Sequence, residues 1–262
     1  MLPLLLACAA EAPPPPPPYR VFPSAAEAVS ALLAEEQPRV LGVGEVHATT
    51  DGPAGPSILA RFTDTLMPVL APVTTDLVIE TWRLDRTCGV VATQVVETVE
   101  VETKRPEVTK DEITLLAEKA NALGVKPHDL VITCEEYGLL QDEAGEVDYD
   151  ALLGLLTDKL GDYALRGLDT PGARLVLYGG AMHNDLHPRE GMERWTYGPR
   201  ARDHSADAYV ELDVYAPELV AGMDLILEPG WAPLLQTAVG PDRAVLYARG
   251  PQSYVLLLPS LP

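Results

Sequence analysis

The sequence predicts an α/β protein with a mostly parallel central sheet flanked by helices. Strand-like and helix-like segments alternate along the chain from Ser24 onward, as in folds built from strand–helix–strand units. The strand-like segments are short, continuous apolar runs, which is typical of parallel strands buried on both faces. The chain has 262 residues, of which 47% are hydrophobic and 22% are charged. This composition is typical of a globular protein, and the length suits one α/β domain.

The helices are predicted from caps and apolar spacing. Ser24 is followed three residues later by Glu27, a pattern typical of a helix N-terminus, and this helix is expected to run to Glu36. The remaining helices are expected at residues 57–70, 110–123, 149–163 and 217–227. Residues 90–108 are rich in Val, Thr and Glu, and their pattern allows either a helix or an extended excursion.

The strands are predicted from apolar runs that end at glycine or at polar residues. Residues 39–44 (RVLGVG) form such a run, and residues 76–81 (DLVIET) form the next. The further strands are expected at residues 130–134, 173–178, 208–214, 244–248 and 254–258. In an open parallel sheet, ligands bind outside the carboxyl ends of the strands, so we expect the functional site at that edge.

Residues 1–23 are predicted to precede the folded domain, which is expected to span residues 24–262. The sequence LLAC at residues 5–8 resembles the lipobox of bacterial lipoproteins, and the proline tract at residues 13–18 would form a stiff polyproline II spacer. We therefore expect an exported lipoprotein that faces the periplasm or the cell surface and touches the membrane only through its lipid anchor. The basic n-region and longer apolar h-region usual in export signals are missing here, so a chance Leu- and Ala-rich start is the alternative.

Charge and cysteine content narrow the classes of partner and site. The chain carries 39 Asp and Glu against 19 Lys and Arg, which gives a net charge of −20. Because such an acidic surface repels phosphates, we expect no nucleic-acid partner. Cys88 and Cys134 belong to no CxxC or CxxH motif, which argues against a thiolate metal site. Their spacing leaves two alternatives open, a disulfide or two free thiols.

The most informative feature of the sequence is a short motif that occurs twice. Residues 40–47 (VLGVGEVH) and 176–183 (VLYGGAMH) both follow the pattern Val-Leu-x-x-Gly-x-x-His. In each copy an apolar strand breaks at a glycine and then presents a histidine, His47 or His183. Both histidines are therefore expected at the carboxyl edge of the sheet, where glycine lets a ligand approach closely.

Two carboxylates are expected beside these histidines. Glu45 lies two residues before His47, so in extended backbone both side chains point the same way. Glu80 closes the apolar run LVIE of the next strand. We predict one catalytic and metal-binding site from four residues: Glu45, His47, Glu80 and His183. Nitrogen and carboxylate ligands without thiolate suit a divalent ion such as Mn, Co, Zn or Fe.

Such a site is suited to hydrolysis of an ester or amide bond. A metal ion with an open coordination position would lower the pKa of bound water, and the carboxylate not bound to the metal would act as general base. Without a metal, the glutamate and histidine could polarise water directly. The sequence leaves both routes open, and also the choice between Glu45 and Glu80 as ligand. It contains no P-loop, dinucleotide fingerprint, Gly-x-Ser-x-Gly elbow or HExxH motif, which argues against a serine hydrolase or a nucleotide enzyme.

The motifs GEVH at residues 44–47 and GAMH at residues 180–183 resemble the paired GxxH motifs of a superfamily that groups Tiki and TraB proteins, ChaN-like haem-binding lipoproteins and erythromycin esterases. The Gly-Glu-x-His form looks closest to the ChaN-like and erythromycin esterase branches. The resemblance implies a metal-dependent protease for the Tiki branch, water activation by glutamate and histidine for the esterases, and haem binding for ChaN-like proteins. We therefore expect a hydrolase of a small-molecule or peptide substrate, with haem or metal binding without catalysis as the alternative.

A second group of residues has weaker support, because each has an ordinary structural explanation: His187, Glu135, Glu136, Trp82 and Tyr178. His187 lies four residues after His183, but Pro188 disfavours a helix that would put both on one face. Tyr178 is predicted to be packed inside its strand, with ligation of haem iron as the alternative.

Overall fold

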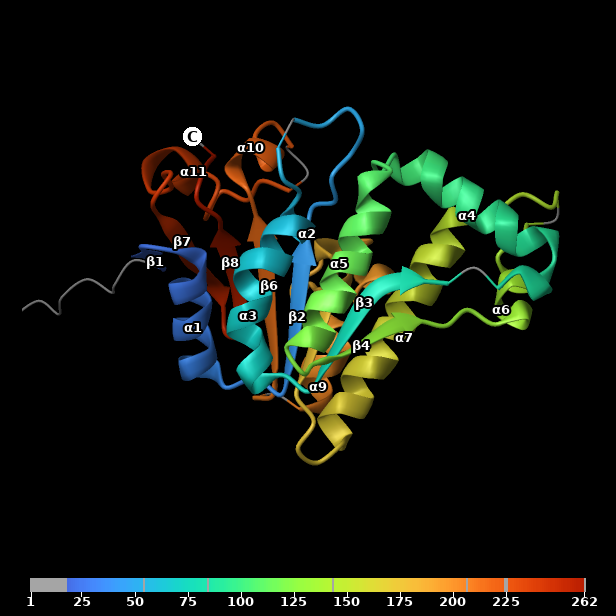
Figure 1. Cartoon of the computed structure of the whole chain (residues 1–262), viewed down its shortest axis with the longest axis horizontal. Helices are drawn as coiled ribbons and strands as arrows, with labels where there is room; N and C mark the ends of the chain where they lie inside the picture. Colours follow the sequence, from blue (N-terminus) through green and yellow to red (C-terminus); the bar gives the residue numbers. More distant parts are fainter. Residues whose placement is uncertain are drawn as a thin grey trace, which may run out of the picture.

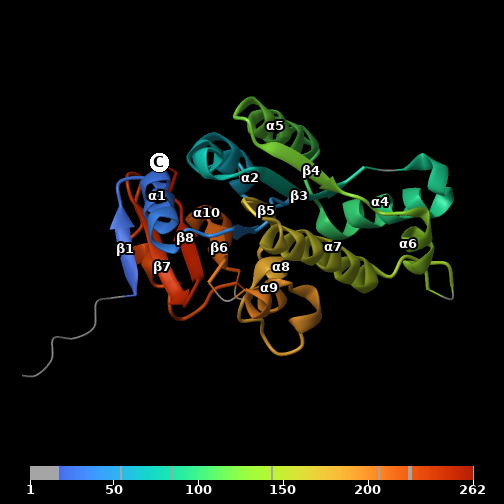
Figure 2. The same ribbon diagram turned by 90° about the horizontal axis from the view of Figure 1, so that it is seen from below.

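The protein folds around an eight-stranded sheet with helices on both faces (Figure 1 and Figure 2). The computed structural model describes residues 18–53, 55–83, 85–142, 144–205, 207–223 and 226–261. The lipobox-like segment and most of the proline tract lie outside the described residues. Within the described ranges, no helix has both the length and the apolar character needed to cross a membrane.

The elements have the following bounds. The strands are β1 (Tyr19–Phe22), β2 (Val40–Glu45), β3 (Asp76–Trp82), β4 (Lys126–Leu130), β5 (Leu175–Gly180), β6 (Tyr209–Tyr215), β7 (Ala244–Gly250) and β8 (Ser253–Leu257). The α-helices are α1 (Ala25–Glu36), α2 (Ile58–Arg61), α3 (Met67–Leu70), α4 (Val90–Thr103), α5 (Val108–Ala122), α6 (Cys134–Leu139), α7 (Tyr149–Asp169), α8 (Ala181–Asn184), α9 (Gly198–His204), α10 (Pro217–Val220) and α11 (Leu234–Thr237). Short 3-10 or π turns are η1 (Phe62–Leu66), η2 (Ala71–Val73), η3 (Arg86–Cys88) and η4 (Glu193–Trp195).

The sheet is mostly parallel with an antiparallel edge. Its strand order is β1-β7-β8-β6-β2-β5-β3-β4. Every neighbouring pair from β8 to β4 is parallel, whereas both pairs that include β7 are antiparallel. The predicted α/β class is therefore confirmed in its coarse form. The antiparallel pair has a local cause, because residues 251–252 between β7 and β8 are too few for the crossover that parallel pairing needs.

Apolar side chains fill both sides of the sheet. On one face, strand residues such as Leu41 and Tyr178 pack under α1, α2, α3 and α5. On the other face, Val40 and Leu177 pack against α7 and α9. A third cluster surrounds Trp231 beside β7 and β8. Because the central strands are buried on both faces, their sequences are continuous apolar runs, as the prediction assumed.

Strand β4 lies earlier in the chain than predicted. A strand was expected at residues 130–134, whereas β4 ends at Leu130 and helix α6 begins at Cys134. Thr133 caps this helix: its side chain accepts the backbone N–H of Glu136, and the Glu136 carboxylate accepts the N–H of Thr133. This reciprocal capping box favours the helix over extension of the apolar run.

The structure decides or corrects three of the helical predictions, and it also has the short helices α8, α9 and α11, which were not predicted. Most of the segment left open, residues 90–108, forms α4 (Val90–Thr103). Helix α7 continues to Asp169 rather than ending near residue 163. The helix expected at residues 217–227 is the shorter α10, which ends at Val220, and Gly222 follows it with a positive φ of 91°. Such a backbone conformation suits glycine and cannot continue a helix.

The N-terminal boundary also differs from the predicted one. Residues 1–23 were expected to precede the domain, yet β1 (Tyr19–Phe22) pairs with β7 and forms one edge of the sheet. This strand is four residues long and lacks the apolar run that marked the central strands. Helix α1 begins as predicted, with the Ser24 side chain accepting the backbone N–H of Glu27.

Cys88 and Cys134 are joined by a disulfide bond. The bond links η3, just before α4, to the first residue of α6. These elements project from one end of the sheet (Figure 1). The structure thus decides the alternative that cysteine spacing left open.

Candidate functional site

The four predicted site residues come together at the carboxyl ends of three neighbouring strands. Strands β2 and β5 pair in parallel register, so that Glu45 lies opposite Gly180. Strand β3 pairs with the other side of β5, which brings Glu80 to the same edge. His47 follows β2, and His183 lies in α8 directly after β5. The two GxxH motifs are therefore adjacent in space, as their matching patterns predicted.

Gly179 and Gly180 have no side chains, and the space that side chains would fill there is occupied by the site residues. A Cβ atom on Gly180 would lie 3.2 Å from Nε2 of His47 and 3.6 Å from Oε2 of Glu80. A Cβ atom on Gly179 would lie 2.3 Å from Oε2 of Glu80, which no real contact allows. The GG pair of β5 is therefore needed for its close approach to neighbouring side chains.

Glu45 orients the His47 imidazole. Nδ1 of His47 lies 2.8 Å from Oε1 of Glu45, and the Tyr178 hydroxyl donates a 2.6 Å hydrogen bond to Oε2 of Glu45. A carboxylate that accepts from Tyr178 through one oxygen accepts from His47 through the other, so Nδ1 of His47 carries a proton. Nε2 of a neutral His47 then has a free lone pair.

His183 is fixed in the same tautomeric sense. Its Nδ1 lies 3.0 Å from the carbonyl oxygen of Trp195 and 2.8 Å from Oγ1 of Thr157. A carbonyl oxygen can only accept a hydrogen bond, so Nδ1 is the donor. Nε2 of His183 faces the carboxylate of Glu80, 3.6 Å from Oε1.

Glu80 is a buried carboxylate held from several sides. The backbone N–H of Gly180 donates a 2.6 Å hydrogen bond to its Oε2, and a guanidinium nitrogen of Arg105 lies 3.9 Å from its Oε1. Burial by itself raises the pKa of Glu80, but its favourable neighbours outweigh burial and bring the pKa below its ordinary value. Those neighbours are His183, His47, Arg105 and the N–H of Gly180. Glu80 is therefore a carboxylate at neutral pH.

The side chains of the four predicted site residues differ in how far they are exposed to solvent. The His47 side chain is 27% exposed, whereas Glu45, Glu80 and His183 side chains are 4–7% exposed. His47 is therefore the member of the site that a substrate reaches directly, and the other three support it from within the protein.

The site residues do not form a ready-made metal centre. In the described part of the chain, only Asp85, Cys88 and Cys134 place three candidate ligand atoms within 4.8 Å of one another. Both of these cysteines are in the disulfide, so this group does not support a bound divalent ion. At the predicted site, Glu45 already binds His47, and Glu80 accepts a backbone N–H. Among the described residues, these four do not place three ligand atoms that close together, so the metal ion stays a prediction and we derive the chemistry of the side chains without it.

Three residues of the site carried no signal in the sequence. Arg105 lies inside the segment whose structure was left open, just after α4, Thr157 lies inside α7, and Trp195 contributes only a backbone carbonyl. Each reaches the site through the packing of distant elements, which no local pattern records. Tyr178 is packed in its strand as predicted, with its ring centroid 4.4 Å from that of Phe62.

The weaker candidates lie elsewhere. His187 is exposed, and Glu136 forms an ion pair with Lys159 at 2.7 Å in addition to its capping role. Glu135 is exposed on α6. Trp82 lines a pocket and also packs against the core on one face of the sheet.

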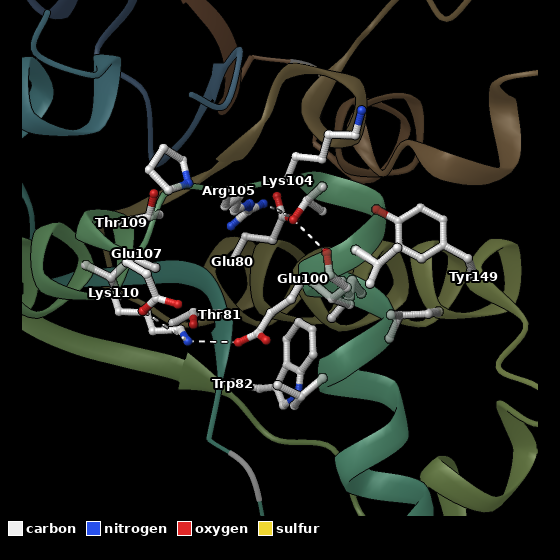
Figure 3. A pocket seen from close by; sticks show the side chains of 18 of the residues that line it. Glu80, Thr81, Trp82, Glu100, Lys104, Arg105, Glu107, Thr109, Lys110 and Tyr149 are labelled. Carbon is white, nitrogen blue, oxygen red and sulfur yellow. Dashed lines mark hydrogen bonds and ion pairs between the residues drawn. The ribbon is translucent and has the colours of Figure 1, made fainter. Parts of the chain in front are cut away.

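This pocket adjoins the site and has a volume of about 520 Å³. It lies between the end of β3, helices α4 and α5, and the first half of α7. Figure 3 shows Glu80 and Arg105 side by side in its lining, together with the ring of Trp82. Glu80 thus belongs both to the pocket and to the predicted four-residue site beside Gly180.

A second buried polar cluster holds α8 against the sheet. The Asn184 side chain donates to the carbonyl oxygen of Gly42 at 3.2 Å and to Asp213 at 3.1 Å. Arg249 donates to Asp213 at 2.9 Å and to Glu211 at 2.5 Å. Burial, and for Glu211 also the charge of Asp213, raises the pKa of both acids despite the opposing effect of Arg249. The cluster fixes the helix that carries the second motif histidine.

Comparisons with known proteins assign no family. No protein-family model matches the chain, and no curated protein matches it. Among solved structures, the chain is similar to the type III effector HopBA1, with 11% sequence identity and a TM-score of 0.47 over 90% of this chain and 94% of that one. A likeness this distant carries no argument about function.

Proposed function

We propose that this protein is a hydrolase that cleaves an ester or amide bond by activating a water molecule at His47. The observation that carries the proposal is the chain of hydrogen bonds from Tyr178 through Glu45 to His47. A carboxylate that fixes the tautomer of a partly exposed histidine, and so leaves the lone pair of the other ring nitrogen free, is the arrangement of a general base in acyl-transfer enzymes.

The proposed reaction uses His47 twice. Nε2 of His47 takes a proton from water as the water oxygen attacks the carbonyl carbon of the substrate. Glu45 stabilises the imidazolium that forms, through its hydrogen bond to Nδ1. As the tetrahedral intermediate collapses, the imidazolium returns the proton to the leaving alcohol or amine, which separates from the carboxylic acid product.

His183 and Glu80 are assigned to the developing oxyanion. Nε2 of His183 and Oε1 of Glu80 lie 3.6 Å apart beside the space above Gly180. In its doubly protonated form, His183 would carry a proton on Nε2 as well, balanced by the Glu80 carboxylate, and would donate it as a hydrogen bond to the oxyanion, an interaction whose removal typically slows turnover by about 10²–10³-fold. This scheme agrees with what the GxxH resemblance implies for the erythromycin esterase branch, and it needs no metal ion.

The test is hydrolysis of p-nitrophenyl acetate and a peptide panel by the full chain and three variants. His47→Ala and Glu45→Gln are expected to lower kcat/KM by about 10²–10⁴-fold, the usual contribution of a general base. The matched control is His204→Ala, because His204 also pairs with a carboxylate, Asp169 at 2.8 Å, but on the surface. Equal rates for His47→Ala and His204→Ala would contradict the proposal.

Metal and haem are tested on the same samples. Activity that persists in EDTA, with less than one equivalent of metal by mass spectrometry, supports the route without metal. Stoichiometric Mn, Co, Zn or Fe that is lost in a His47→Ala/His183→Ala variant would overturn that route. The alternative of haem binding without catalysis has less support, because the Tyr178 hydroxyl is buried and donates to Glu45. A Soret band on addition of haem would favour it.

We also propose that the protein acts outside the cytoplasm as a lipoprotein. The Cys88–Cys134 disulfide supports an oxidising compartment, where such bonds persist. Expression of the full chain in a bacterial host, followed by mass spectrometry of the membrane fraction, should detect lipid on Cys8. The Cys8→Ala variant should lack the lipid and leave the membrane fraction, and an unmodified Cys8 would contradict the proposal.

A further inference from the structure

The 520 Å³ pocket beside Glu80 has walls suited to an apolar ligand. Helix α4 contributes Val96 and Val99, α5 contributes Ile113, and α7 contributes leucines that include Leu153. The Trp82 side chain, at the end of β3, adds an aromatic surface. Volumes of 300–1,000 Å³ with mainly apolar walls and a few polar groups are typical of sites for small molecules.

The charged side chains around the pocket compensate one another. Three acids and three bases line it: Glu80, Glu100, Glu107, Lys104, Arg105 and Lys110. Lys110 lies 2.8 Å from Glu100 and 3.8 Å from Glu107, and Figure 3 shows the contact with Glu100. Arg105 lies 3.9 Å from Glu80. Because positive and negative groups balance, the pocket has no excess charge with which to select an ionic ligand.

The pocket is connected to the proposed reaction centre by shared elements. Glu80 lines the pocket and also faces Nε2 of His183. On α7, Leu156 lines the pocket and the next residue, Thr157, contacts Nδ1 of His183. On the other side, Thr50 of the His47 loop lines the pocket, and its N–H donates to the carbonyl oxygen of Lys104 at 2.9 Å. The pocket therefore adjoins the proposed reaction centre through Glu80, α7 and the loop that follows His47.

We propose that this pocket binds an uncharged, apolar substituent of the substrate, so that the enzyme prefers esters or amides that carry a bulky alkyl or aryl group. This inference rests on the proposed function for the position of the scissile bond. The occupancy of the pocket by an apolar group rests on the walls and the charge balance alone. Because each methylene group removed from water adds to the favourable transfer free energy, a substituent that fills the pocket gives a large preference over acetyl.

The test compares two tryptophan variants on one helix. Val96 lines the pocket, whereas Val90 is 75% exposed and outside its lining, so Val96→Trp fills the cavity and Val90→Trp is the matched control. The first measurement is hydrolysis of p-nitrophenyl acetate and p-nitrophenyl octanoate by the full chain. Val96→Trp is expected to lower kcat/KM for the octanoate by about 10–200-fold and to leave the acetate within about twofold. Val90→Trp should behave as wild type with both esters.

The second measurement does not depend on turnover. The uncharged fluorescent probe N-phenyl-1-naphthylamine should bind wild type and Val90→Trp with one saturable site, and Val96→Trp should lose that site. If the probe binds in this way but neither ester is hydrolysed, the proposed function fails and the pocket assignment stands. If the probe does not bind, or binds Val96→Trp as well as wild type, the pocket assignment fails. A wild-type preference for the acetate over the octanoate would also overturn it.

Discussion

The hydroxyl group of Tyr178 donates a 2.6 Å hydrogen bond to Glu45, and this buried contact joins two adjacent parallel strands. Tyr178 is on β5 and Glu45 ends β2, so the bond crosses the sheet at its carboxyl edge. Burial and the charge of Glu45 raise the pKa of Tyr178 well above its ordinary value, so the hydroxyl keeps its proton and stays a donor. Glu45 is thereby held in one orientation toward His47.

Replacing Tyr178 by Phe should remove the hydrogen bond that orients Glu45 while it keeps the packing of the aromatic ring. The ring stays against Phe62, but the Glu45 carboxylate loses its donor. We expect a loss of about 1–3 kcal/mol in the free energy of unfolding, the cost of an unsatisfied buried acceptor, and a fall in kcat/KM. Urea titration and ester hydrolysis measure the two effects.

The matched control for this variant is Tyr254→Phe. Tyr254 also donates its hydroxyl to a glutamate, Glu36, away from the predicted site. This variant should lower stability without lowering kcat/KM. An equal loss of activity in both variants would remove the special role assigned to Tyr178.

Substitution by alanine at the two glycines that end β5 should have different effects, on activity at Gly180 and on stability at Gly179. In Gly180→Ala, the added Cβ would lie 3.2 Å from Nε2 of His47, so the ring must move by a few tenths of an ångström. In Gly179→Ala, the Cβ would lie 2.3 Å from the buried carboxylate of Glu80, which has less room to move. We expect Gly180→Ala to lower kcat by about tenfold to a hundredfold with little change in unfolding midpoint, since small misplacements of reacting groups are costly.

Gly179→Ala should instead lower the unfolding midpoint. Displacing Glu80 disturbs its hydrogen bond with Gly180 and the ion pairs around it. Thermal unfolding and steady-state kinetics on both variants provide the comparison. A Gly179→Ala protein as stable as wild type would show that the sheet edge accommodates a side chain there.

Two buried acids should affect stability in opposite directions as the pH changes. The folded-state pKa of Glu80 is lowered, so its ionised form stabilises the protein above its ordinary value of about 4.3, and this stabilisation is lost as the pH falls through the folded pKa. The stability advantage of wild type over Glu80→Gln should therefore be greatest near neutral pH and shrink below about pH 4.

Glu211 should show the opposite trend. Burial and the nearby Asp213 raise its folded-state pKa, so the folded protein holds a proton that the unfolded chain releases. Wild type should lose stability relative to Glu211→Gln as the pH rises from about 4.3 through the folded pKa. Urea titrations of wild type and both variants from pH 3 to pH 8 measure how the stability difference between wild type and each variant changes with pH. Parallel curves for the three proteins would contradict this account.

The disulfide should stabilise the projecting region beside the pocket. Cys88 and Cys134 are separated by 46 residues, and closing a loop of that length lowers the entropy of the unfolded chain by an amount worth about 4 kcal/mol. Cys88→Ser/Cys134→Ser should lower the free energy of unfolding by about 2–4 kcal/mol. Because η3 leads directly into α4, octanoate hydrolysis should fall more than acetate hydrolysis. Urea titration and the two esters test this, with reductant added to wild type as an independent comparison.

The repeated Val-Leu-x-x-Gly-x-x-His pattern was enough to predict that the two motif histidines lie at the same edge of the sheet. It placed two histidines after apolar strands, and parallel pairing of β2 with β5 then makes the motifs neighbours. Continuous apolar runs predicted strands covered on both faces for the same reason, because a strand buried on both sides has no polar face. These features are local in sequence, and the carboxyl edge of a parallel sheet follows from them.

Tertiary structure alone decided what surrounds those histidines. The hydroxyl of Tyr178, the hydroxyl of Thr157 and the guanidinium of Arg105 reach the site from three different elements. The 2.8 Å contact between Glu45 and His47 likewise depends on side-chain positions. Hydrogen bonds and ion pairs between residues more than 20 positions apart depend on how helices pack onto the sheet, and local periodicity carries no record of that packing.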